Sequence, residues 1–160
     1  HYAGKSVGLI GTKRTVQSGV YVKKIDETNK NIVLHSMATP LLAPMIEEGF
    51  FNNQISHEII AQYLGEHALS DVEALILACT HYPLIKREIN EYYGGRIPIL
   101  DSSEVVARAL HTYLKENNLL NSSQSPYQHF YVSDYTPSFE ASTRLFFREM
   151  VHLEKHALWT

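Results

Sequence analysis

An apolar run of strand length, residues 74–78, leads directly into the single cysteine of this 160-residue chain, Cys79. A hydroxyl and an imidazole follow at Thr80 and His81, and Pro83 comes two residues later. Short apolar runs bounded in this way are typical of buried parallel strands, and proline often occupies the first position of a helix. The stretch therefore predicts a buried strand that runs into a helix. In open α/β sheets, ligands bind at such strand exits.

Cys79 has two interpretations. The unpaired N–H groups at the start of the following helix favour an anion, and His81 adds a second donor or positive charge, so that Cys79 could be a reactive thiolate. A lone cysteine at the end of a buried strand is more commonly a small hydrophobic residue. A lone histidine is likewise more commonly a solvated loop residue. The residues by themselves leave both interpretations open.

Segments typical of strands alternate with segments typical of helices. We expect strands at residues 5–11, 31–36, 74–78, 97–100 and 129–133. We expect helices at residues 16–25, with Thr15 as N-cap, and at residues 45–49, 55–64 and 83–93. A further helix is expected after a cap at residues 101–103. The last is expected after Thr136, with Phe139, Phe146, Met150 and Leu153 facing the core. Residues 117–126 read as a solvated loop. This alternation predicts an α/β fold with a mainly parallel sheet and flanking helices.

Composition narrows the partners. The formal net charge is -3 and 19% of residues are charged, so no basic field invites nucleic acid. No apolar run approaches the roughly 20 residues of a membrane span. We therefore expect neither nucleic-acid nor membrane partners. A single cysteine excludes an internal disulfide framework and suits a reducing compartment, so we expect a cytoplasmic protein. His152 and His156 lie four apart in the last expected helix but lack a third ligand, so we expect no metal.

Four segments carry a resemblance to a known family. The string Leu-Ala-Cys-Thr-His-Tyr-Pro-Leu at residues 77–84 closely resembles the second catalytic-cysteine motif of glutamate racemase, in the aspartate/glutamate racemase superfamily. Residues 11–21 are similar to the family segment Gly-Thr-x-x-Thr-x-x-Ser-x-x-Tyr, and residues 40–49 to Pro-Leu-x-x-Pro-x-x-Glu-Glu-Gly. Residues 130–139 are similar to the C-terminal strand, turn and helix of the family.

The resemblance implies a reaction and a set of residues. Members interconvert L- and D-glutamate without a cofactor, using two thiols that flank the substrate, and they supply D-glutamate for peptidoglycan. Cys79 corresponds to the second thiol, which takes the proton from the L enantiomer. The other implied site residues are His81 and Glu47 in catalysis and Thr12, Thr15 and Thr80 in substrate binding. Without the resemblance, Glu47 would be interpreted as a helix-surface carboxylate, and Thr12 with Thr15 as an ordinary strand–helix connection.

One position departs from the family pattern, and part of the pattern is missing. The family often has a cysteine where Thr39 stands; it is not a proton-transferring residue, so we expect the change to be neutral. Members are longer, with an Asp-Ser-Gly segment and a first cysteine motif upstream. The chain begins with His1 rather than Met. We therefore expect an inactive fragment that resembles the C-terminal portion of the enzyme and lacks the first thiol.

The resemblance also implies a domain organisation. Residues 1–101 are expected to form one α/β domain that carries the second thiol. Residues 102–160 are expected to return and complete the other, N-terminal domain, which is absent. The substrate is expected to be a small molecule, glutamate, and a homodimer stays open.

Two further hypotheses remain. Another superfamily member, such as an aspartate or hydantoin racemase or a maleate isomerase, would use the same thiol chemistry on a different substrate. A non-catalytic ligand-binding module would have an unreactive Cys79.

Overall fold

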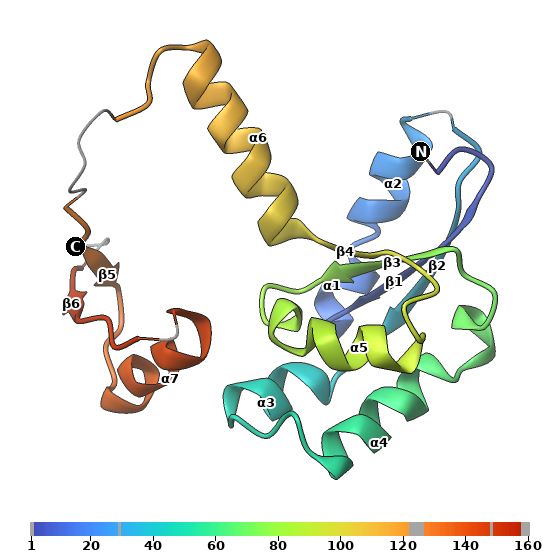
Figure 1. Ribbon diagram of the computed structural model, residues 1–160, viewed down its shortest axis with the longest axis horizontal. Coiled ribbons are helices and arrows are strands. Elements are labelled where there is room, and N and C mark those ends of the chain that lie inside the picture. The colour runs from blue at the N-terminus through green and yellow to red at the C-terminus, as the bar shows by residue number, and fades with distance from the viewer. Residues whose placement is uncertain (1, 29, 122–126, 148, 158–160) are drawn as a thin grey trace. The chain divides into compact units, whose positions relative to one another are not determined.

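The computed structural model describes residues 2–28, 30–121, 127–147 and 149–157. The chain divides into two compact units, residues 1–107 and 108–160 (Figure 1). The boundary falls inside helix α6 (Ser102–Glu116). The domain boundary expected after residue 101 rests on the strands with which residues 102–160 would pair in another domain. That boundary stays a prediction.

The first unit is built on a four-stranded sheet. Its strands are β1 (Ser6–Gly11), β2 (Val33–Ala38), β3 (Ala74–Ala78) and β4 (Ile99–Asp101). They lie in the order β2-β1-β3-β4, and every neighbouring pair is parallel. The predicted α/β class with a mainly parallel sheet is confirmed, and β3 is the apolar run that precedes Cys79.

Helices connect the strands and cover the sheet. They are α1 (Lys13–Gln17), α2 (Val20–Asp26), α3 (Leu42–Glu47), α4 (Gln54–Leu64), the 3-10 helices η1 (His67–Leu69) and η2 (Tyr82–Ile85), and α5 (Lys86–Tyr92). Helix α6 begins directly after β4. Helices α3, α4 and α5 lie on one side of the sheet, and α2 lies on the other (Figure 1). The main core packs Ile10 and Leu77 of the sheet against Ile46, Ile60 and Ile89 of these helices.

The helix predicted at residues 16–25 is wrong in extent. Two short helices, α1 and α2, occupy this stretch and meet at Gly19, whose φ of 64° lies in the left-handed region that glycine tolerates. The predicted N-cap is also wrong: Thr12, not Thr15, caps α1 and accepts a 3.2 Å hydrogen bond from the Thr15 N–H. Both threonines can cap a helix, but Thr12 is the one in extended conformation next to β1.

The segment after Cys79 also differs from the expectation. The chain enters the 3-10 helix η2, and the α-helix α5 begins only at Lys86. Two hydrogen bonds tighten the turn, from the Tyr82 N–H to the Cys79 carbonyl and from the Leu84 N–H to the His81 carbonyl. A helix dipole acts only near its first turn, so the dipole of α5 does not favour an anion at Cys79.

The second unit contains a parallel pair of strands, β5 (Phe130–Val132) and β6 (Leu153–Lys155), joined through α7 (Pro137–Phe147). The predicted helical face is wrong beyond residue 147, because Leu153 lies in a strand and Met150 is exposed. Phe139 and Phe146 are half exposed. Val151 and Leu153 are buried on either side of an exposed residue. This period-two alternation is typical of a strand.

The remaining predictions for this region have mixed outcomes. His152 and His156 do not share a helix. Of the loop expected at residues 117–126, residues 122–126 lie outside the described part. None of the helices in the described residues is long and apolar enough to span a membrane.

An ion-pair network fixes the start of α6 in the first unit. The buried Asp101 carboxylate accepts hydrogen bonds from Lys86 Nζ at 2.6 Å and from the Glu104 N–H at 2.9 Å, and Lys86 also contacts Glu104 at 2.7 Å. Burial by itself would raise the pKa of Asp101, but the bonds from Lys86 and from two backbone N–H groups hold it below its ordinary value. The pKa of Lys86 is raised in turn, because its two carboxylate partners outweigh its partial burial.

This network predicts an acid-sensitive contribution to stability. Lys86→Met should lower the free energy of unfolding at pH 7 by about 1–3 kcal/mol. A carboxyl with a depressed folded pKa stabilises above the unfolded value of about 3.9, and this contribution is lost as the pH falls through the folded pKa. The gap between wild type and Lys86→Met should therefore narrow as the pH falls below about 4.

Urea unfolding followed by circular dichroism across this pH range measures the gap. Lys24→Met removes the exposed Lys24–Glu27 pair and should change stability by less than about 1 kcal/mol. If the difference in the free energy of unfolding between wild type and Lys86→Met does not vary with pH, the ion pair is not its cause, and the loss comes from packing of the lysine side chain.

Candidate active site

The carboxyl ends of β1, β2 and β3 lie together at one edge of the sheet. The register pairs the last residue of β1 with the last residues of both β2 and β3. The residues that follow, Thr12, Thr39 and Cys79, therefore leave the sheet as neighbours. This edge is the position at which open α/β sheets bind ligands.

Cys79, His81 and Glu47 form a continuous line of side chains at this edge. The Cys79 sulfur lies 3.7 Å from Nδ1 of His81, and Nε2 of His81 lies 3.1 Å from Oε1 of Glu47. Cys79 is half-buried, whereas the Glu47 side chain is 57% exposed. When Nε2 donates its proton to Glu47, Nδ1 can accept the proton of the thiol. The structure thus brings together the three residues implied in catalysis, and their roles stay a prediction.

The two threonines of the glycine turn are also adjacent. Their hydroxyl oxygens lie 2.9 Å apart, and both residues are half-buried. The N-cap bond between Thr12 and Thr15 accounts for their spacing without a ligand, so their role in substrate binding stays a prediction. Thr80 lies exposed in the turn between Cys79 and His81, and its side chain makes no hydrogen bond within the described residues.

Sequence reasoning missed two buried residues at the same edge. Thr39 is fully buried, and its hydroxyl lies 2.7 Å from that of Tyr82. The neutral effect expected of threonine in place of the family's cysteine stays a prediction. Burial raises the pKa of Tyr82 to about 12, although the hydrogen bond with Thr39 opposes this shift. One signal was available, since a tyrosine inside an apolar segment next to His81 needs a partner for its hydroxyl when buried.

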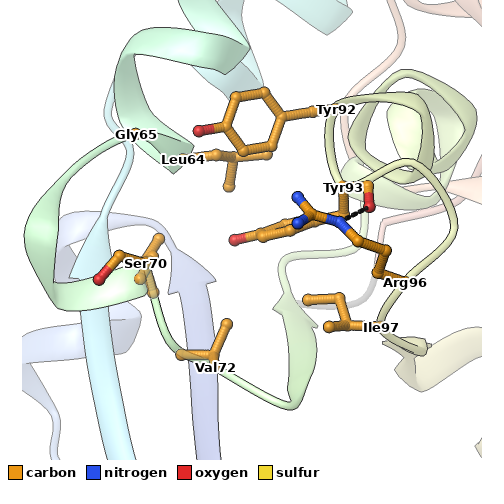
Figure 2. Close-up of a pocket in the computed structure, with 9 residues that line it drawn as sticks. Leu64, Gly65, Ser70, Val72, Tyr92, Tyr93, Arg96 and Ile97 are labelled. Atoms are coloured by element: carbon orange, nitrogen blue, oxygen red, sulfur yellow. Dashed lines mark hydrogen bonds between the residues drawn. The ribbon is translucent and has the colours of Figure 1, made fainter.

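A cavity of about 440 Å³ lies elsewhere in the first unit, between the end of α4 and the end of α5 (Figure 2). Its lining includes Val72 and Ile97, which precede β3 and β4, so it sits at the opposite edge of the sheet from Cys79. The ring of Tyr93 crosses it, and the buried Tyr93 hydroxyl has no hydrogen-bond partner within the described residues. None of the predicted site residues lines this cavity, so it is not the candidate active site.

The described residues contain no group of three or more His, Cys, Asp or Glu side chains placed to share a metal ion.

Comparisons with known proteins identify the relatives of the chain. No protein-family model matches it. Glutamate racemase from Geobacter metallireducens is 37% identical over 134 residues, which cover 83% of this chain and 50% of that protein. The crystal structure of glutamate racemase from Francisella tularensis in complex with D-glutamate is 36% identical, with a TM-score of 0.84, over 95% of this chain and 57% of that one. This chain is homologous to glutamate racemases.

A second structure agrees with this relationship. Glutamate racemase from Thermus thermophilus in complex with Beta-chloro-D-alanine is 31% identical, with a TM-score of 0.82, over 96% of this chain and 57% of that one. The chain thus spans about half the length of the glutamate racemases that it matches.

The line of side chains predicts how Cys79 reacts. His81→Asn should slow alkylation of Cys79 by iodoacetamide at pH 7 roughly 10-fold, because the thiol loses the base that accepts its proton. Glu47→Gln should slow alkylation by a smaller factor, because His81 keeps its position but loses the facing charge. Rates are measured by mass spectrometry of the chain, whose one cysteine makes the readout unambiguous.

The matched control is Glu48→Gln, which neutralises the adjacent exposed carboxylate and should leave the rate unchanged. Equal rates for wild type and His81→Asn would contradict the assignment of His81 as the base.

Proposed function

We propose that this chain is part of a glutamate racemase in which Cys79 exchanges the proton on the α-carbon of glutamate. The observation that carries the proposal is the line from Cys79 through His81 to Glu47 at the ligand-binding edge of the sheet. Homology to glutamate racemases supports the reaction. The relative from Francisella tularensis binds D-glutamate, which supports the substrate.

The proposed step is a proton transfer from carbon to sulfur. The α C–H bond of L-glutamate breaks, its proton joins the thiolate of Cys79, and its electron pair stays on the α-carbon, next to the carboxylate. A proton delivered to the opposite face by a second thiol then gives D-glutamate. The resting thiolate of Cys79 would form by transfer of its proton to Nδ1 of His81, and the charge of Glu47 would stabilise the resulting imidazolium.

Substrate would be held by the hydroxyl groups at the same edge. Thr12 and Thr15 follow β1, which pairs directly with β3, so they lie beside the turn of Cys79. Hydroxyl and backbone N–H groups are suitable donors to a carboxylate. We assign Thr12, Thr15 and Thr80 to the binding of substrate carboxylates, next to the thiol that acts on the α-carbon.

We further propose that the chain is the C-terminal portion of a longer enzyme. The relatives are about twice as long, and the 160 residues contain only one of the two thiols that the reaction needs. Helix α6 exposes an apolar group formed by Val105, Val106, Leu110 and Tyr113, as expected of a surface that packs against another segment. The complete enzyme would act in the cytoplasm and supply D-glutamate for peptidoglycan.

Substitution of the thiol tests the proposed role of Cys79. In the full-length protein, Cys79→Ser should reduce racemisation of glutamate by on the order of 10²–10⁴-fold, which is the usual effect of removing a positioned acid–base group. Exchange of the α-proton of D-glutamate with deuterated solvent should persist, because the other thiol handles that enantiomer. Circular dichroism follows racemisation and proton NMR follows the exchange. Racemisation close to that of wild type would exclude Cys79 as a catalytic group.

A second prediction concerns the 160 residues by themselves. They hold one thiol on one side of the proposed site, so they should not convert L-glutamate to D-glutamate at a measurable rate by circular dichroism. Sustained turnover of L-glutamate by the isolated chain would show that the two-thiol mechanism is wrong for this protein.

The choice of substrate is tested with the full-length protein. L-Aspartate, tested in the same circular dichroism assay, distinguishes glutamate from the substrate of a related racemase.

A further inference from the structure

Two buried hydroxyl groups join the strand exits that carry the proposed site. Thr39, directly after β2, is fully buried; its N–H donates to the Gly11 carbonyl at 2.9 Å, and its hydroxyl donates to the same oxygen at 3.3 Å. Tyr82 is fully buried, and its hydroxyl lies 2.7 Å from Oγ1 and 3.1 Å from the carbonyl oxygen of Thr39. One assignment satisfies both protons: Tyr82 donates to Thr39, and Thr39 donates to Gly11.

These bonds connect the neighbours of the proposed site residues. Gly11 directly precedes Thr12, and Tyr82 directly follows His81. The segment after Thr39 leads into α3, whose last residue is Glu47. A single hydrogen-bonded group therefore joins the segment that carries the threonines, the segment that carries the base, and the helix that carries the orienting carboxylate.

We propose that Thr39 and Tyr82 are positioning residues, which hold His81 in register with Cys79 and with the Thr12 turn. The inference rests on the proposed function. Side-chain packing resists separation of the three segments but has little direction, whereas hydrogen bonds fix both a distance and an angle. Misplacement of a catalytic group by about 1 Å can cost 100-fold in rate, so removal of these bonds should affect the chemical step.

The chain offers a matched control for loss of a buried tyrosine hydroxyl. Tyr93 is 5% exposed, and burial raises its pKa to about 12, as it does for Tyr82. Its hydroxyl has no partner within the described residues, and it lies in the cavity at the opposite edge of the sheet (Figure 2). Tyr93→Phe and Tyr82→Phe remove the same atom from similar surroundings, but only the second removes hydrogen bonds.

Steady-state kinetics of the full-length protein with L-glutamate test the proposal. Tyr82→Phe and Thr39→Val should each lower kcat roughly 10-fold or more with a smaller change in KM. The double variant should be no worse than the poorer single variant, because both substitutions break the same group. Thr39→Ser keeps the hydroxyl and should retain most of the activity, and Tyr93→Phe should match wild type.

The rate of Cys79 alkylation as a function of pH provides the second readout, and it requires no racemase activity. Tyr82→Phe and Thr39→Val should displace this profile, and Tyr93→Phe should not. Failure of the full-length wild type to racemise glutamate would overturn the proposed function and leave the alkylation profiles to decide the positioning role. Variants that lower the unfolding midpoint but keep the wild-type kcat and alkylation profile would overturn the positioning role.

Discussion

The site depends on the parallel pairing of β1 with both β2 and β3. Because the pairing is parallel and in register, three strand exits meet at one edge of the sheet. Thr39 and Cys79 therefore lie beside Gly11, although they follow it in the sequence by 28 and 68 positions (39 − 11 and 79 − 11). Gly11 allows the close approach, since a Cβ there would lie 3.3 Å from the Ala78 carbonyl oxygen and 3.4 Å from Cβ of Thr15. A side chain at this position would be tight against the Ala78 carbonyl oxygen, directly before Cys79.

The buried side chains show why this edge keeps one geometry. Thr39 and Tyr82 are polar groups inside an apolar core, and a buried hydroxyl without a partner is costly. Their mutual hydrogen bond satisfies both and thereby favours one placement of η2 against the ends of β1 and β2. The Tyr93 hydroxyl at the opposite edge has no such partner within the described residues. Among the described residues, the buried tyrosine hydroxyl therefore has a directing effect at the edge that carries Cys79 and none at the edge that carries Tyr93.

The sequence predicts the strands better than the turns. Apolar runs locate β1, β3 and β4 to within a few residues, because a buried parallel strand needs continuous apolar side chains. The start of α1 depends on which of two threonines caps it, and both satisfy the same local rule. The line from Cys79 to Glu47 was found only through resemblance to a family, since the two residues are 32 positions apart (79 − 47). The bond between Thr39 and Tyr82 depends on sheet register, which no local pattern records.

The exposure of Glu47 bears on how the proposed thiol is activated. Its side chain is 57% exposed, and an ion pair with His81 in that environment is screened by water and contributes little. The same pair would interact more strongly if a further segment covered it, because the effective dielectric constant falls as water is excluded. On the proposed function, that segment also carries the second thiol. The segment that carries the second thiol would then also strengthen the ion pair between Glu47 and His81. Cys79 would therefore reach its full reactivity only when its partner thiol is present.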